Sequence, residues 1–252
     1  MDGAFPDRNS STPLHVQLAE RLRQLIITGE YQPGDRLSPE KELVGRFGLS
    51  RVTVRNGLAL LEREGWILKR QGLGTFVCNP IEQDLTSVQT VSEVAHAKGI
   101  ITDTRLLSFG PVIPPKQIAK ALGRPANEKL LRIEKLHADD VSPIALTQSF
   151  VSLEVQPEAE VMRSQPSVAM IVIWEHIFGV RIKGAHHHFR AEPADADTAS
   201  ALALDVGAPV LALDRILYAE DGRALEFIST FYRWNRYQFS IALPRLRITD
   251  LR

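Results

Sequence analysis

Two arginines one helical turn apart, Arg51 and Arg55, are the residues whose type and spacing most clearly suit binding chemistry. Residues four apart on a helix share a flank, so both guanidinium groups face the same way. A guanidinium forms bidentate hydrogen bonds with phosphate or with O6 and N7 of guanine. Ser50 and Thr53 stand at the start of the same segment, where hydroxyl groups donate to phosphate. Such a pair more often marks a solvated face, so it favours nucleic-acid contact only together with its surroundings.

A hairpin with a glycine-rich turn follows that segment. Residues 66–70 and 75–77 read as two short strands, and Gly72-Leu73-Gly74 lies between them. Glycine lets a turn approach a groove closely, although most turns of this type are only turns. Glu40 and Lys41 lie at the start of an earlier helical segment, where we expect them to be close to the backbone of a bound nucleic acid. The further candidate contacts are Glu40, Lys41, Arg70, Gln71 and Gly72.

The elements that must position these residues are predicted from apolar periodicity. Leucines at intervals of three and four predict a helix from about 14 to Gly29. Ser38 as cap and Pro39 in the first turn predict a second helix, which ends at Gly48. Ser50 caps a third helix that ends at Gly65. Three helices and a hairpin in this order predict a winged helix-turn-helix domain over residues 1–78.

The remainder of the chain has a different pattern. Residues 79–90 are predicted to be a linker, and residues 91–252 to form a second domain in which strands and helices are mixed. Asp139-Asp140 and Glu220-Asp221-Gly222 each separate two apolar runs, which is typical of hairpins. An α+β domain with a mostly antiparallel sheet follows. The expected strands are 101–109, 129–138, 144–151, 180–192, 209–219 and 223–233, and the expected helices are 91–98, 115–122, 168–177 and 194–204.

Composition restricts the classes of protein to consider. The chain has 30 basic and 30 acidic residues. Residues 1–80 have an excess of only two basic residues, which by itself does not indicate a nucleic-acid-binding segment. Cys78 is the single cysteine, so no disulfide can form within the chain. Residues 1–13 lack the apolar core of a signal peptide, and no apolar run reaches the length of a membrane span. We therefore expect a cytoplasmic protein.

Three motifs together resemble the GntR family of transcription regulators. They are GDRLSPEKEL at 34–43, FGLSRVTVR at 47–55 and RQGLGTFV at 70–77. The later segments DVSPIALTQS at 140–149 and DGRALEFISTFYRWNRY at 221–237 resemble the ligand-binding UTRA domain of the HutC-type branch, whose fold is similar to chorismate lyase. Two positions depart from the family pattern: Ser38-Pro39 stands in place of Pro-Ser, and Gly57 in place of alanine.

The resemblance implies a sequence-specific DNA-binding regulator and no enzyme. It further implies a homodimer on an inverted repeat, which acts as a repressor until a small-molecule effector releases it. Two alternatives are an enzyme with the lyase fold and an architectural DNA-binding protein without an effector. Neither a nucleophile elbow nor a phosphate loop occurs in the sequence, and a second domain of about 160 residues is more than an architectural protein needs.

The resemblance also assigns candidate effector-binding residues on the strands of the second domain. Lys135 and His137 take places that the family often gives to arginine, and Thr147 takes one often given to glutamate. Because three of five places differ, a carboxylate or another modest anion suits the site at least as well as a sugar phosphate. Strand residues that merely face water are the alternative. The five candidates are Lys135, His137, Thr147, Glu226 and Tyr232.

Three consecutive histidines, His186 to His188, raise the question of a metal site. His186 and His188 share a strand face, and His176 or Glu175 could complete a ligand set. Only two of these side chains are local, and strand histidines more often have other partners. We therefore expect neither a metal nor any other cofactor.

Overall fold

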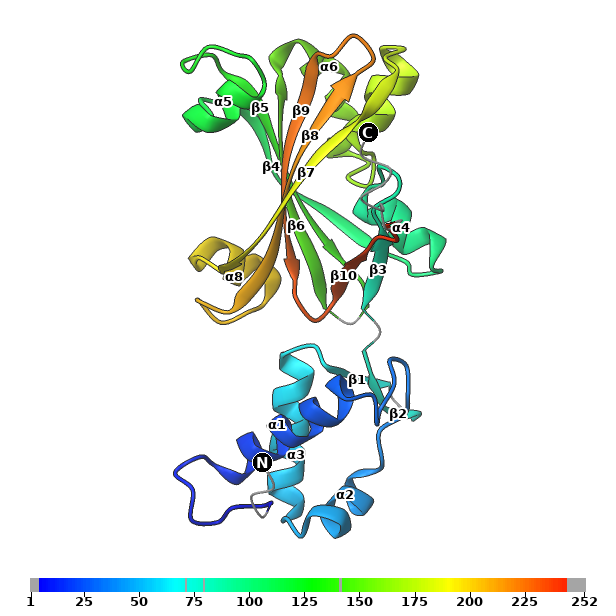
Figure 1. The fold of residues 1–252 in the computed structure, drawn as a ribbon, viewed down its shortest axis with the longest axis vertical. Helices are drawn as coiled ribbons and strands as arrows, with labels where there is room; N and C mark the ends of the chain where they lie inside the picture. The colour runs from blue at the N-terminus through cyan, green and yellow to red at the C-terminus, as the bar shows by residue number, and fades with distance from the viewer. Residues whose placement is uncertain (1–4, 71, 79, 141, 244–252) are drawn as a thin grey trace, which may run out of the picture. The chain divides into compact units, whose positions relative to one another are not determined.

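The computed structural model describes residues 5–70, 72–78, 80–140 and 142–243, and the chain forms two compact units (Figure 1). The first unit spans Met1–Pro80 and the second spans Ile81–Arg252. In the described ranges, each helix is too short or too polar to cross a bilayer. Each unit has its own apolar core, so we describe them separately.

The first unit is a winged helix-turn-helix, as predicted. Its strands pair antiparallel, with Ile67 opposite Val77. The backbone N–H of Leu37 donates to Thr75 O at 2.8 Å, which ties the segment before the second helix to the hairpin. The elements are α1 (Leu14–Ile27), α2 (Glu40–Phe47), α3 (Arg51–Arg63), β1 (Ile67–Arg70) and β2 (Gly74–Val77).

The helix ends follow the sequence signals, with one correction. Ser50 is the N-cap of α3, because its side chain accepts a hydrogen bond from Thr53 N at 3.1 Å. Gly48 ends α2 with φ of 61°, a left-handed conformation that glycine adopts without steric cost. Ser38 is not the cap of α2: the N-cap position is Pro39, and no side chain caps that helix.

Leucines of α1 and α3 form the centre of the first unit's core. Leu18 and Leu22 of α1 and Leu61 of α3 are fully buried. Gly57 lies at the crossing of the two helices, where an added Cβ would come within 3.0 Å of His15 O and of a Leu18 methyl group. The absence of a side chain at Gly57 therefore allows α1 and α3 to pack closely.

The second unit is built on one six-stranded antiparallel sheet, as predicted. Neighbouring strands keep a continuous register over long stretches, for example from Leu130 opposite Ser152 to His137 opposite Ala145. In sheet order the strands are β4 (Asp103–Val112), β5 (Leu130–Ala138), β6 (Pro143–Ser152), β9 (Ala224–Arg233), β8 (Pro209–Ala219) and β7 (Ile182–Pro193).

Helices cover both faces of this sheet. On what we call the outer face, α5 (Lys116–Ala121) packs on Phe150 and Phe227, and α8 (Ala196–Leu202) packs on Leu146 at the other end (Figure 1). The opposite, inner face carries alternate residues such as Ala145 and Tyr232. It is covered by α4 (Val91–Ala97) and by the turns η1 (Leu153–Val155), α6 (Gln156–Ala159), η2 (Glu160–Arg163), α7 (Met170–Val172) and η3 (Ile173–Ile177).

The segment 79–90, which we expected to be a linker, differs from that prediction. Residues Ile81–Asp84 form β3, which pairs in parallel with β10 (Tyr237–Ser240). Ile81 is fully buried against α4 and Tyr237. The sequence between 80 and 90 therefore belongs to the second unit, because β10 supplies hydrogen-bond partners that a local reading of four residues does not show.

Two glycine substitutions test the close packing of α1 and α3. Gly57→Ala gains about 1 kcal/mol of helix propensity, but overpacking against His15 O costs about 1–3 kcal/mol. We expect a net loss of stability in urea unfolding of the full chain, with faster hydrogen exchange in α1 and α3. Gly45→Ala in α2 is the matched control, because no described atom lies within 4 Å of its added Cβ apart from its chain neighbours and the backbone of its own helix. It should stabilise the unit, and equal effects of both changes would contradict the packing argument.

Candidate functional site

The predicted DNA contacts on α2 and α3 lie on the surface of the first unit. The Arg51 side chain is 77% exposed, and its Nε lies 3.8 Å from Glu40 Oε2 at the start of α2. An exposed ion pair at this distance contributes little, so it leaves Arg51 available to a ligand. Arg55 and Lys41 are also exposed. Two cations of one helix are thus presented together, with a third at the start of its neighbour.

Ser50 and Thr53 also stabilise the start of α3. The two hydroxyl groups are 2.8 Å apart, and Ser50 Oγ accepts from the backbone of Thr53. The Ser50 oxygen is therefore engaged in holding the first turn of α3. A phosphate contact by either residue would have to keep this capping bond.

The turn between β1 and β2 has the conformation that its glycines allow. Gly72 is exposed and has φ of 74°, and Gly74 has φ of 120°. A Cβ at Gly74 would come within 2.7 Å of Arg36 Nε, a contact that the flexible arginine side chain can relieve by moving, so it is the backbone conformation that favours glycine here. Arg70 is the last residue of β1, and Gln71 lies outside the described residues.

One exposed apolar residue of α3 was not among the predicted contacts. Val52 is 68% exposed, whereas Val54, Leu58 and Leu61 on the same helix are buried. Its position outside the apolar stripe was the available signal in the sequence. A methyl-bearing side chain beside arginines suits contact with the methyl group of thymine.

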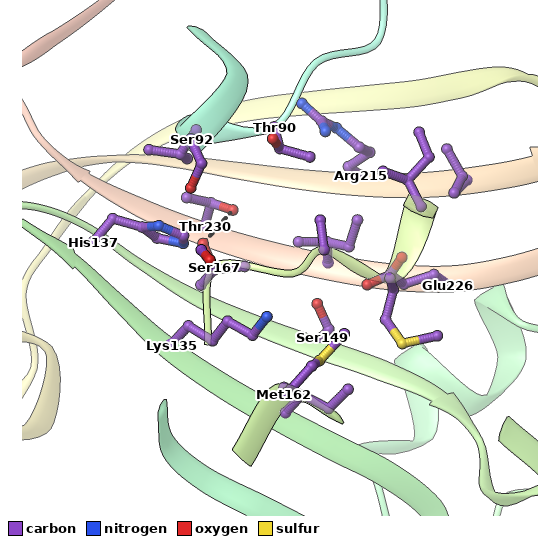
Figure 2. Close-up of a pocket in the computed structure, with 18 of the residues that line it drawn as sticks. Thr90, Ser92, Lys135, His137, Ser149, Met162, Ser167, Arg215, Glu226 and Thr230 are labelled. Carbon is purple, nitrogen blue, oxygen red and sulfur yellow. Dashed lines mark hydrogen bonds between the residues drawn. The ribbon is translucent and has the colours of Figure 1, made fainter. Parts of the chain in front are cut away.

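The five predicted effector residues come from three separate strands of the second unit, and all of them line one cavity. The cavity has a volume of about 80 Å³, and one water needs roughly 10–15 Å³. It therefore has room for a small molecule. Figure 2 shows the side chains converging from the sheet and from the covering segments. The cavity lies between the inner face and the segments 88–92 and 162–171.

Strand register explains why these residues meet. Lys135 of β5 is opposite Thr147 of β6, and Thr147 is opposite Thr230 of β9. Residues two apart on a strand share a face, so the whole set points to the inner face. The polar residues of the cavity that were not predicted are Thr90, Ser92, Ser149, Ser167, Arg215 and Thr230.

Lys135 and His137 are both buried, and burial changes their ionisation. Burial lowers the pKa of Lys135 to about 8, while the charge of Glu226 opposes that change. Its ammonium group donates to the carbonyl oxygen of Val168 in the covering segment. Burial, with a smaller effect of Lys135, lowers the pKa of His137 to about 4. The imidazole is therefore neutral at physiological pH, and its Nδ1 lies 3.3 Å from Thr104 Oγ1.

Glu226 is the buried acid of the cavity. Burial raises its pKa to about 7, although a hydrogen bond from Ser149 and the charges of Lys135 and Arg215 act in the opposite direction. Burial likewise raises the pKa of Tyr232 to about 12, so this phenol stays protonated. Glu226 can accept hydrogen bonds as a carboxylate or donate one as an acid near neutral pH.

Arg215 is the second buried cation of the cavity, and part of its guanidinium has no hydrogen-bond partner among the described residues. The residue is 7% exposed on β8. Its Nη1 donates to Gln89 O at 2.9 Å, whereas Nε is buried and has no hydrogen-bond acceptor among the described residues. Figure 2 shows its guanidinium beside Thr90. Since both faces of β8 carry apolar residues, alternation alone did not reveal which way Arg215 points.

The histidine run on β7 packs with aromatic side chains. The His186 ring lies 5.2 Å from the Tyr218 ring, and the His187 ring lies 6.0 Å from that of Phe189. No group of three or more metal-ligating side chains occurs within the described part of the chain.

Two protein families match this chain over most of its length. Residues 14–77 match the family described as bacterial regulatory proteins, gntR family, and residues 97–238 match the UTRA domain. Each match lies within one of the two structural units. The matched ranges include all of α3 and most of the residues that line the cavity.

Individual relatives agree with these matches. HTH-type transcriptional regulator Rv0792c of Mycobacterium tuberculosis is 41% identical over 93% of this chain and 87% of its own length. HTH-type transcriptional repressor NagR of Bacillus subtilis is 30% identical over 95% of this chain and 98% of its own. The crystal structure of PhnF from Mycobacterium smegmatis matches with a TM-score of 0.59 at 23% identity, over 90% of this chain and 99% of that one.

The raised pKa of Glu226 gives a test in the pH dependence of stability. Its pKa of about 7 lies above the value of about 4.3 for an unfolded glutamate. The folded chain therefore keeps this proton longer, and stability is lost as the pH rises through 7. Relative to Glu226→Gln, the free energy of unfolding of the wild type should fall between about pH 5 and pH 8.

Urea unfolding at several pH values measures this difference. Glu154→Gln is the control, because Glu154 is an exposed carboxylate and its removal should leave the pH dependence unchanged. A difference between wild type and Glu226→Gln that does not vary with pH would show that burial does not govern Glu226.

Proposed function

The chain belongs to the gntR family of bacterial regulatory proteins and is a DNA-binding transcriptional regulator with a UTRA domain, and we propose that it is a repressor released from its operator by a small-molecule effector. The cavity carries this proposal. The segments 88–92 and 162–171 border it, charged, hydroxyl and apolar groups line it, and it lies in the unit that the family uses for effectors. The chain is accordingly a regulator and not an enzyme.

We propose that α3 enters the major groove of the operator. Arg51 and Arg55 would bind guanine or phosphate, and Lys41 and Glu40 would lie near the backbone. Ser50 and Thr53 would contact phosphate at the start of α3, with the wing residues Arg70, Gln71 and Gly72 at an adjacent groove. A helix-turn-helix usually binds two half-sites about one helical turn apart. A homodimer on an inverted repeat is therefore our proposed DNA-bound form, acting in the cytoplasm, where bacterial DNA lies.

We propose that the effector binds against the inner face of the sheet. Lys135, His137, Thr147, Glu226 and Tyr232 would hold it. What supports this is their convergence on one cavity from three strands. If the effector binds more tightly to a conformation that has low affinity for DNA, it increases the population of that conformation. The protein is then released from the operator.

Arg51→Ala tests the DNA contact. A duplex selected from a random pool by the wild-type chain should bind the variant about 1–3 kcal/mol less tightly, with a smaller difference from a scrambled duplex. Arg63→Ala is the matched control, because it removes the same charge from the other end of α3. Fluorescence anisotropy over a range of salt concentrations measures both. Unchanged affinity and salt dependence in Arg51→Ala would remove that residue from the interface.

Lys135→Ala tests the effector site separately from DNA binding. The variant should bind the selected duplex with wild-type affinity, because Lys135 lies in the second unit. Compounds that raise the melting temperature of the wild type in a metabolite screen should release the wild type from DNA but not the variant. Equal release of both proteins would place the effector elsewhere.

A further inference from the structure

The cavity of the second unit contains an uneven set of charges. Among the described residues that line it, Lys135 and Arg215 are cations and Glu226 is the acid. His137 is neutral, because burial lowers its pKa to about 4. With Glu226 ionised, two cations against one carboxylate leave one positive charge in a buried site. Buried charge is stable only when it is paired.

The two cations differ in what they already bind. The Lys135 ammonium donates to the carbonyl oxygen of Val168. Arg215 donates from Nη1 to Gln89 O at 2.9 Å, but its buried Nε has no acceptor in the described part of the protein. An unpaired buried donor on a charged group is costly. The unfilled hydrogen-bonding capacity of the site is therefore on β8, at Arg215.

Rather than at Lys135 and His137, we propose that the anionic group of the effector binds at Arg215, and that the effector is a sugar acid: a small molecule with one carboxylate and several hydroxyl groups. This inference rests on the proposed effector-controlled repression. It assigns a residue that the sequence did not reveal, and it narrows the anion, for which the sequence allowed a carboxylate, to a sugar acid.

The carboxylate follows from the balance of charge. One ligand carboxylate beside Lys135, Arg215 and ionised Glu226 makes the buried set neutral. A phosphate dianion would leave a negative charge, and a neutral sugar would leave the positive one. A carboxylate also matches the guanidinium fork, whose Nε and Nη groups bind its two oxygens.

The hydroxyl groups follow from the rest of the lining. Thr90, Ser92, Ser149, Ser167 and Thr230 line the space together with apolar residues, and their hydroxyl groups both donate and accept hydrogen bonds. Glu226 adds an acceptor in its ionised form. A ligand rich in hydroxyl groups satisfies such a wall, whereas a simple fatty acid would leave it unpaired.

Compounds that differ at a single carbon test the ligand class. D-glucuronate, D-glucose and D-glucose 6-phosphate share one ring and carry a carboxylate, a hydroxyl and a phosphate at C6, and the galactose series offers the same three. Isothermal titration of the full chain should detect binding of at least one sugar acid, tighter than that of its neutral and phosphorylated counterparts. The inference is overturned if neither acid binds, or if a phosphate or neutral sugar binds more tightly.

Variants test the residue. Arg215→Met should weaken binding of the sugar acid by about 30-fold or more, because it removes one partner of a buried ion pair. Arg215→Lys keeps the charge and protects folding, and it should still weaken binding, because lysine lacks the fork. Arg223→Met removes an exposed arginine of the same hairpin and should have no effect. Wild-type affinity in Arg215→Lys would overturn the assignment.

Binding to the selected duplex distinguishes a failure of the ligand class from a failure of the proposed repressor function. Arg215→Lys should bind it as the wild type does. If the wild type binds a duplex but neither sugar acid, only the ligand class fails. If the wild type prefers no duplex at all, the proposed repressor function fails, whichever sugars bind.

Discussion

The burial of Lys135, Arg215 and Glu226 on one face of the sheet is the constraint on which the second unit depends. Buried charged groups are stable only when oppositely charged groups or hydrogen-bond partners lie within contact distance. The protein supplies these from its covering segments, through Val168 O for Lys135 and Gln89 O for Arg215. The same hydrogen bonds therefore hold the covering segments in place and stabilise the buried cations.

This arrangement links the cavity to the start of the second unit. Gln89 O accepts from Arg215 and also from Gln83 Nε2 at 3.4 Å, and Gln83 Oε1 accepts from Tyr237 at 2.8 Å. Gln83 belongs to β3, which begins at Ile81, directly after the first unit ends. A ligand that changes the bonding of Arg215 thus acts on an acceptor shared with the strand that continues from the DNA-binding unit.

The first unit meets a simpler requirement. Its apolar core holds α3 while the other side of that helix stays free of packing, so Arg51, Val52 and Arg55 remain exposed. The ion pair of Arg51 with Glu40 spans 3.8 Å and competes weakly with a phosphate or a guanine. The DNA contacts that we propose for α3 would therefore need little rearrangement within this unit.

The sequence by itself determined the helices and strands that its local period encodes, including all three helices of the first unit and the six strands of the sheet. It also placed Lys135, His137, Thr147, Glu226 and Tyr232 in one site, because a family pattern records positions that alternation assigns to one face. It did not reveal β3, whose partner β10 lies about 150 residues away, or the direction of Arg215. Those features, and the pKa of Glu226, depend on which groups long-range packing brings together, and only the tertiary structure decided them.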